Sequence, residues 1–379
     1  MSVAEAMQEN VNSRTVQLVK LLSEFGPDIP EISRRLGQFK ESVRYRYKEK
    51  ILSRGFVVQA AVDHERLGLR RVVLITEVSE EYRKYAGAIF SAMNELCYLV
   101  GFHRTLVGGE FILNLSVPRD KVNEIVAFFD TLKQKGMFTS VEVLEFDWVR
   151  VAPMKPEFYD FDTGRWDYEW KNAPGEDYKA VSFAPSEAVR FDLTDLLIIK
   201  ELQMDANKSL KEISDKLQVN YKKLAWHYSS HVLGRKMLRG YNVKWMGTGY
   251  DYAIEKALHR KHKYFAVDLF VRNVSEYELM ALRHSFDRLP FLWGEASGRN
   301  YFAELAIPVD YVVEGLQYLG DATNSVKDRM TIFPLDQTEA VNFTIPYPLF
   351  DPVLKRWIFN NEDLVKRFET LIMQIKTPS

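Results

Sequence analysis

Two groups of basic side chains could bind a polyanion, because each lies on a predicted helix in an otherwise neutral chain. Residues 40–54 include the bases Lys40, Arg44, Arg46, Lys48, Lys50 and Arg54. Residues 220–240 include Lys222, Lys223, Arg235, Lys236 and Arg239, with no acid. The formal net charge of the 379 residues is only −1, so both groups are local patches. Such patches bind phosphate, which predicts contact with a nucleic acid.

Histidine and cysteine offer other chemistry. His227 and His231 stand four residues apart on one predicted helix, a spacing that can bind a metal ion. No carboxylate or cysteine is close to them in the sequence, so no metal site is expected. The single cysteine, Cys97, excludes a disulfide within the chain and fits a cytoplasmic location. No G-x-S-x-G, phosphate-loop or HExxH motif is present, so neither an enzyme, nor catalytic residues, nor a cofactor is predicted.

The chain contains an internal repeat, which assigns the two basic groups to equivalent places. Residues 29–54 align without a gap with residues 210–235. The repeat continues into the tails, where Arg165-Trp166 matches Arg356-Trp357. Between the halves, residues 173–190 are rich in Pro, Gly, Ser and acids, which predicts a linker.

Each half begins with three short helical patterns. In the first half they span residues 14–25, 29–36 and 40–53, and in the second half residues 192–204, 209–217 and the segment after Asn220. Asn220 can cap its helix, whereas Phe39, at the equivalent place, cannot. Phe39 should therefore leave a fraying helix or dock its ring on a neighbour. An apolar run such as 55–58 follows, which completes the order of a winged helix-turn-helix.

A second unit follows in each half. In the first half, residues 71–78, 99–106, 110–117 and 141–149 are strand-like, and residues 80–96 and 120–135 are helical. This βαββαβ order is ferredoxin-like. The predicted fold class is α+β, with two winged helix-turn-helix and two ferredoxin-like domains in tandem. The expected domains are 12–66, 67–172, 191–250 and 251–379. Because each sheet has one bare face, the two sheets are expected to pack together within the chain.

Both halves resemble the Lrp/AsnC family of feast/famine regulators. The second half has FDLTDLLIIKELQMDANKSLKEISDKLQV, similar to the family's opening, with Asp192 and Asp195 at the start of the first helix. The stretch 107–111 resembles the family's effector-domain loop. This chain departs from the family in carrying two copies, in Phe39, and in an insertion at 241–263 that includes Arg260-Lys261-His262-Lys263.

The resemblance implies a transcription regulator that binds double-stranded DNA through its third helices. The predicted DNA-contacting residues are Lys40, Ser42, Arg44, Tyr45, Lys48, Tyr221, Lys222, Lys223, Trp226 and His227. Arg44 is expected to recognise bases and the second helix to hold the backbone. Gly108, Gly109 and Gly298 are the candidate ligand-binding residues, with turn formation as the alternative. A small-molecule effector and a homodimer are left open. No membrane span is expected, and the predicted location is cytoplasmic, at the nucleoid.

An enzyme is the alternative to this interpretation. Siroheme decarboxylases share the two-domain fold, and some are fused halves that place His, Arg and Tyr around a tetrapyrrole. His103 and Arg104, before the glycine turn, could serve such a site. Glu295-Ala296 stands there in the second half, and the third helices are more basic than an enzyme needs, so the regulator is preferred.

Overall fold

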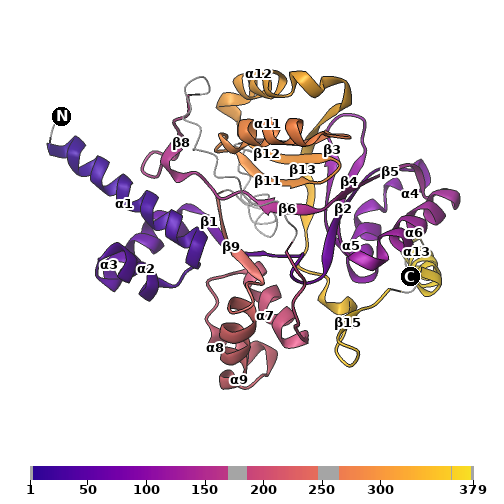
Figure 1. Ribbon diagram of the computed structural model, residues 1–379, viewed down its shortest axis with the longest axis horizontal. Coiled ribbons are helices and arrows are strands. Elements are labelled where there is room, and N and C mark those ends of the chain that lie inside the picture. The colour runs from indigo at the N-terminus through magenta and orange to yellow at the C-terminus, as the bar shows by residue number, and fades with distance from the viewer. Residues whose placement is uncertain (1–2, 170–185, 246–263, 360, 377–379) are drawn as a thin grey trace.

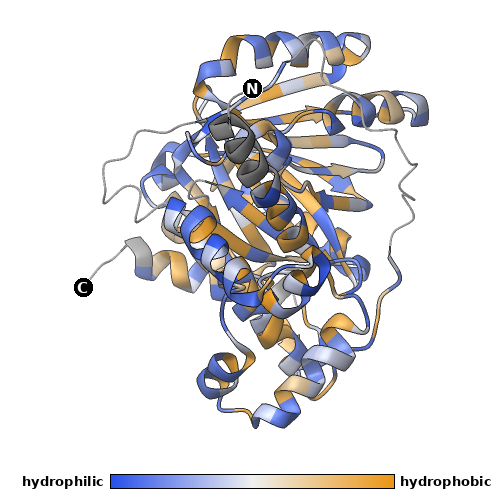
Figure 2. Cartoon of the chain, turned by 90° about the vertical axis from the view of Figure 1, so that its left-hand side faces the viewer, coloured by the Kyte–Doolittle hydropathy of each residue, from blue (hydrophilic) through white to orange (hydrophobic). Residues whose placement is uncertain are grey.

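The computed structural model describes residues 3–169, 186–245, 264–359 and 361–376. Among these, no helix has the length and apolar character needed to cross a membrane. The predicted linker at 173–190 and the insertion at 241–263 lie mainly outside the described residues. Figure 1 shows a central sheet with helices on its outer sides. In Figure 2 the strands carry many of the hydrophobic residues, and the outer helices alternate between hydrophobic and hydrophilic ones.

The two halves repeat the same order of elements. The first half contains α1 (Val3–Phe25), α2 (Ile29–Leu36), α3 (Lys40–Arg46), β1 (Phe56–Val62), β2 (Leu69–Val78), α4 (Glu80–Arg83), α5 (Ala86–Leu96), β3 (Leu99–Thr105), β4 (Phe111–Pro118), α6 (Val122–Gln134), β5 (Phe138–Phe146), β6 (Trp148–Val151), β7 (Tyr159–Asp160) and β8 (Arg165–Trp166). The second half contains α7 (Leu193–Met204), α8 (Leu210–Leu217), α9 (Tyr221–Trp226), β9 (Leu238–Trp245), β10 (Tyr264–Val271), α11 (Glu276–Asp287), β11 (Leu292–Ser297), β12 (Tyr301–Pro308), α12 (Val312–Ala322), β13 (Met330–Asn342), β14 (Phe350–Asp351), β15 (Arg356–Trp357) and α13 (Asn361–Lys376). The helix expected at 80–96 is thus two helices, and π-helical turns at Tyr47–Ile51 and His227–Leu233 continue α3 and α9.

One antiparallel sheet of nine strands joins the halves, in the order β5-β2-β4-β3-β13-β10-β12-β11-β6. Strand β13 bridges them, because its first part pairs with β10 and its later part with β3. The segment after α6 also bridges the halves, because β5 pairs with β2 of the first half and β6 pairs with β11 of the second. A buried apolar layer that includes Val73, Ile112, Phe270 and Phe302 packs between the two parts of the sheet. The expectation that the sheets cover one another within the chain is confirmed.

The strands that follow the third helices pair with each other across the two halves. Strand β1 pairs antiparallel with β9 of the other half, from Phe56 opposite Trp245 to Val62 opposite Leu238. Together they make a separate two-stranded ribbon, called here the β1–β9 ribbon. A lone apolar strand can satisfy its backbone groups only by pairing, and the equivalent strand of the other half is its partner. The strand expected after the third helix of the first half is therefore present, and it pairs with its counterpart from the other half.

Local signals set the helix starts of the second half. The Asn220 side chain accepts hydrogen bonds from the backbone N–H groups of Lys222, at 2.9 Å, and Lys223. Phe39 caps nothing, yet α3 begins at the next residue and the Phe39 ring is 87% exposed. The prediction that this ring docks on a neighbour is wrong, because the buried Val43 and Tyr47 already fix the helix.

Glu201 joins α7 to α8 through three lysines. Its fully buried carboxylate accepts from Lys200, Lys208 and Lys216 at 2.8, 2.7 and 2.9 Å. Burial opposes its charge, but the three ammonium groups outweigh burial and lower the pKa of Glu201 to about 2. We expect Glu201→Gln to lower the free energy of unfolding at neutral pH by about 2–3 kcal/mol.

This contribution should depend on pH with a defined sign. Because folding lowers the pKa of Glu201 from 4.5 to about 2, the stabilisation is complete above the ordinary value and disappears as the pH falls toward the lowered one. Urea titrations of both proteins at neutral and strongly acid pH measure the difference. An equal effect of the substitution at both pH values would contradict the assignment.

Candidate functional site

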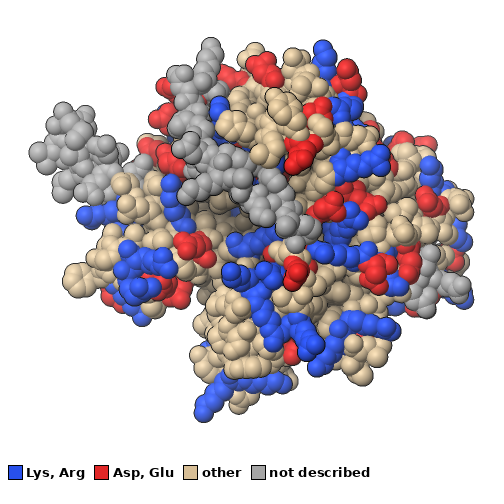
Figure 3. All heavy atoms as spheres, in the orientation of Figure 1, with Lys and Arg blue, Asp and Glu red and all other residues tan. Residues whose placement is uncertain are grey.

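Most side chains predicted to contact DNA lie on the outer surface of the third helices. The exposed ones are Lys40, Ser42, Tyr45, Lys48, Tyr221, Lys222, Lys223 and Trp226. On the face drawn in Figure 3, Lys and Arg gather at the centre and bottom, over the region of β9 and α7–α9.

Two of the predicted DNA-contacting residues are placed differently. Arg44 is partly buried, and its guanidinium donates to both carboxylate oxygens of Glu41, at 2.5 and 2.6 Å. His227 is buried, with its Nδ1 atom 2.9 Å from Asp195 Oδ1. The sequence-based argument that no carboxylate lies near the histidine pair is therefore wrong, because folding brings the start of α7 against α9.

The three candidate ligand-binding glycines lie in turns. Gly108 and Gly109 adopt φ values of 87° and 79° in the β3–β4 hairpin, which favour glycine. A Cβ atom on Gly298, between β11 and β12, would lie 2.8 Å from Asp147 Oδ2. None of the three lines the cavity described next, and their role in ligand binding stays a prediction.

A cavity of about 210 Å³ lies between the β1–β9 ribbon and the nine-stranded sheet. Both halves line it, with residues of β1, β2, β3 and β4 from the first half and of β9, β11 and β12 from the second. Its charged and imidazole side chains are His64, Arg71, His103, Arg150, Arg239, Lys244, Glu295 and Glu304. Bases thus outnumber acids in a site at the centre of the molecule.

Some of these bases have fixed acidic partners. Arg150 lies 2.7 Å from both Asp287 and Glu295. Arg239 lies 3.1 Å from Asp63 and 3.0 Å from a carboxylate oxygen of Glu65. The charges of these two arginines are therefore balanced by the protein itself.

His64, Arg71 and Lys244 differ, because no carboxylate of the described residues forms an ion pair with them. The buried atoms His64 Nδ1 and Arg71 Nε also have no hydrogen-bond partner there. Burial lowers the pKa of Arg71 to about 10 and lowers that of Lys244, and Glu304 opposes both effects. Cationic donors that face a cavity without an ion pair favour an anionic ligand.

His103 contributes a proton donor. Its Nδ1 atom lies 3.6 Å from Oδ2 of the fully buried Asp268, which comes from β10 of the other half. Burial opposes the charge of His103, but attraction to Asp268 and Glu304 outweighs it and raises its pKa. Burial also opposes the charge of Asp268 and, although His103 counteracts it, raises the pKa of this carboxyl to about 6.

The pKa of His64 is shifted in the opposite direction. Burial, helped by the charges of Arg71 and Arg239, lowers its pKa to about 3. The cavity therefore favours the neutral form of His64 and the protonated form of His103. Environments that separate the pKa values of two like groups are typical of acid–base sites.

The cavity continues into a groove that a larger ligand could use. A groove of about 590 Å³ shares Ala61, Arg150, Val151, Arg239 and Asn242 with the cavity wall. Trp293, Phe302 and Phe343 add flat aromatic surfaces to the cavity. Ligand pockets usually enclose about 300–1,000 Å³, so the cavity and the groove together suit a broad, flat, anionic molecule.

The halves place different residues at equivalent positions of the sheet. His103 lies opposite Ile112 in the first half, and Ala296 lies opposite Phe302 in the second. Because Ile112 and Phe302 occupy the same place in the repeat, His103 and Ala296 are equivalent. By the same comparison of strand registers, Asn114 is equivalent to Glu304, and Val73 to Asp268. The acid–base group therefore exists once, although the fold repeats.

Sequence reasoning identified His103 but missed most of this site. Arg104, named with it, lies outside the cavity and pairs with Glu339 at 3.0 Å. The available signal was a charge inside an apolar strand, as in Asp268 of YFAVDLFV and Glu304 of YFAELAIP. Such charges are rarely buried without a functional or pairing reason.

Comparisons with known proteins place this site in context. No family model matches the sequence, and no curated protein matches it. The crystal structure of the siroheme decarboxylase NirDL is similar with a TM-score of 0.53 and 12% identity, covering 96% of this chain and 99% of that one. The same enzyme with an iron-uroporphyrin III analogue gives 0.52 and 12%, covering 95% and 98%. At this identity the likeness shows a shared fold.

These findings correct the functional prediction. We predicted a DNA-binding regulator and no enzyme, but the fold shared over nearly the whole chain is that of an enzyme. The regulator interpretation is wrong, and the findings favour the alternative of a tetrapyrrole enzyme of the same fold.

Proposed function

We propose that the chain decarboxylates an iron tetrapyrrole of the siroheme class. The observation that carries the proposal is that Arg71 and Lys244 line the cavity without an ion pair to any described carboxylate, in a chain with the fold of the siroheme decarboxylase NirDL. A siroheme-like macrocycle is flat, broad and rimmed with carboxylates. These are the properties that the aromatic walls, the adjoining groove and the cations select.

In this proposal Arg71 and Lys244 bind rim carboxylates of the substrate. Carboxylates would satisfy the donors that lack a partner, and a low local dielectric strengthens the attraction. The neutral His64 has the protonation state that binds iron, since a protonated imidazole has no free lone pair. We assign it to the iron of the substrate.

His103 then supplies the proton of the reaction. The bond between the carboxyl carbon and the methylene carbon of an acetate side chain breaks, and CO₂ leaves. The electron pair stays on the methylene carbon, where the conjugated ring delocalises it. The Nε2–H of the His103 imidazolium protonates that carbon to give a methyl group and leaves a neutral imidazole. Asp268, 3.6 Å from Nδ1, stabilises the imidazolium before this transfer, and solvent restores the proton afterwards.

Spectroscopy and product analysis test the proposed function. Added iron uroporphyrin should bind once per chain and shift its Soret band, and His64→Ala should alter that shift. Siroheme incubated with the protein should lose CO₂, with a matching loss of mass in the product. A chain that leaves both the Soret band and the siroheme unchanged would contradict the proposal.

Other predictions from the sequence keep their status. A cytoplasmic location rests on the single cysteine alone and stays a prediction, and so does a homodimer. A small-molecule partner, left open there, is in this proposal the substrate itself.

A further inference from the structure

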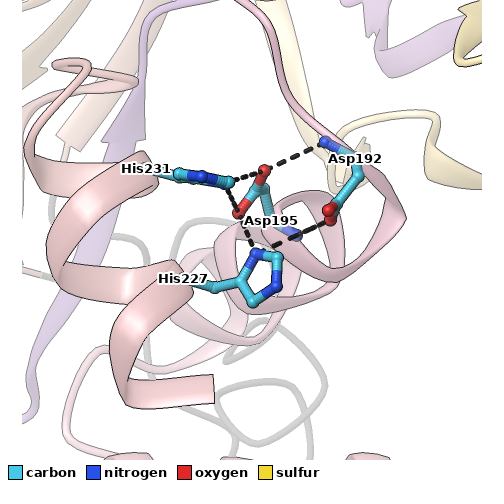
Figure 4. Close-up of side chains that lie close together, drawn as sticks. All are labelled: Asp192, Asp195, His227 and His231. Carbon is cyan, nitrogen blue, oxygen red and sulfur yellow. Dashed lines mark hydrogen bonds and ion pairs between the residues drawn. The ribbon is translucent and has the colours of Figure 1, made fainter. Parts of the chain in front are cut away.

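Four side chains outside the cavity converge at the start of α7. Asp192 and Asp195 come from the first turn of this helix, and His227 and His231 from the π-helical turn after α9 (Figure 4). Both imidazoles direct Nδ1 at the Asp195 carboxylate, at 2.9 Å for His227 and 3.0 Å for His231. Asp192 Oδ1 lies 3.7 Å from His227 Nδ1.

The spacing of these donor atoms suits a small divalent cation. One ligand atom from each residue lies within 4.8 Å of all the others. Metal–ligand bonds of roughly 2.0–2.2 Å in a tetrahedron separate the donor atoms by about 3.3–3.6 Å. The three distances above fall on both sides of that range, so small side-chain movements would complete the geometry.

The carboxylates keep capacity for an ion while they cap the helix. Asp192 Oδ1 accepts from the backbone of Thr194 and Asp195, and Asp195 Oδ2 accepts from the backbone of Asp192. Each carboxylate has about four acceptor sites, so lone pairs remain. Asp192 is partly exposed and offers an entry path.

The charge of Asp195 also favours a cation. Its side chain is fully buried, and no lysine or arginine of the described residues forms an ion pair with it. The first half has basic residues at the places equivalent to Asp195, His227 and His231, namely Arg14, Arg46 and Lys50. In the first half, burial lowers the pKa of Arg46, and the nearby positive charge of Arg14 lowers it further. The two halves have thus taken opposite charges at one position of the repeat.

We propose that Asp192, Asp195, His227 and His231 form a divalent metal site of the zinc class, which fastens the start of α7 to α9. Two imidazoles with two carboxylates suit Zn²⁺ or Co²⁺ better than Mg²⁺ or Ca²⁺, which prefer oxygen alone. All four positions carry protein ligands, as in a structural site. The site is separate from the proposed tetrapyrrole cavity, whose wall includes none of these residues.

Cobalt titration of the full chain, freed of metal with a chelator, tests the site. One equivalent of Co²⁺ should give the intense visible bands of tetrahedral cobalt, and Zn²⁺ should abolish them. Binding should also quench part of the tryptophan fluorescence, because the Trp226 ring centroid lies 4.6 Å from that of His231. Trp226→Phe should remove the quenching and keep the bands.

Variants locate the ion. His231→Asn should abolish the bands, as should Asp192→Asn, which keeps the cap because asparagine also accepts from the helix start. The matched control is His284→Asn, at an exposed histidine, which should titrate like the wild type. Wild-type protein without cobalt bands would overturn the proposal. So would bands that persist in folded His231→Asn but vanish in His103→Asn, which would place the ion in the cavity.

Discussion

His103→Asn should reduce the rate of siroheme decarboxylation roughly 10²–10⁴-fold, the usual contribution of a general acid. Asparagine keeps a polar group of similar size but cannot donate the proton. The affinity for iron uroporphyrin should change little, because the binding cations stay in place. Single-turnover rates and Soret titrations of the same preparations separate the two effects.

The pH profile provides an independent readout of the same residue. The reaction needs protonated His103, and Asp268 helps to raise its pKa. The wild-type rate should therefore fall as the pH rises through the raised pKa of His103. His284→Asn is the control and should match the wild type. A His103→Asn protein with the wild-type rate would exclude His103 as the proton donor.

Arg71→Met should weaken the binding of iron uroporphyrin by a factor of roughly 30–100, the effect of losing one buried charge-assisted contact worth about 2–3 kcal/mol. The same substitution should raise the free energy of unfolding of the ligand-free protein by about 1–2 kcal/mol. Arg71 holds a partly buried charge without an ion pair, and methionine fills a similar volume without that desolvation cost. Soret titration measures the expected loss of affinity, and urea unfolding measures the expected gain in the free energy of unfolding.

Arg70→Met is the matched control, since the neighbouring arginine pairs with Glu145 at 2.7 Å and with Asp147, outside the cavity. It should leave binding unchanged and should not stabilise the protein. If Arg71→Met instead bound as tightly as the wild type, the cavity would not be the carboxylate site.

The fold was largely predictable because its local signals are strong. The alternation of apolar residues predicts most strands, and Asn220 predicts the start of α9, as found. The internal repeat predicts two sheets that cover each other. The pairing of β1 with β9 could not be predicted, because the run at 55–58 indicates a strand but carries no information on its partner. The domain boundaries stay predictions.

The site was less predictable, because its residues meet only through long-range strand pairing. His103 and Asp268 are 165 positions apart in the sequence, and the crossing of β13 between the halves brings their strands together. The surface bases of the third helices gave a stronger sequence signal than these isolated buried charges. That difference explains why the regulator was preferred to the enzyme.

The unequal halves have a consequence for how such a protein could evolve. In a homodimer encoded by one gene, any mutation appears twice, so acquiring Asp268 opposite His103 would also replace the equivalent Val73 on the other side. A buried apolar contact would be lost along with the gain. Once the gene is duplicated and fused, each copy can mutate alone, and one copy can supply the imidazole while the other supplies the carboxylate. Fusion therefore permits a single specialised centre that a symmetric ancestor could have only in duplicate.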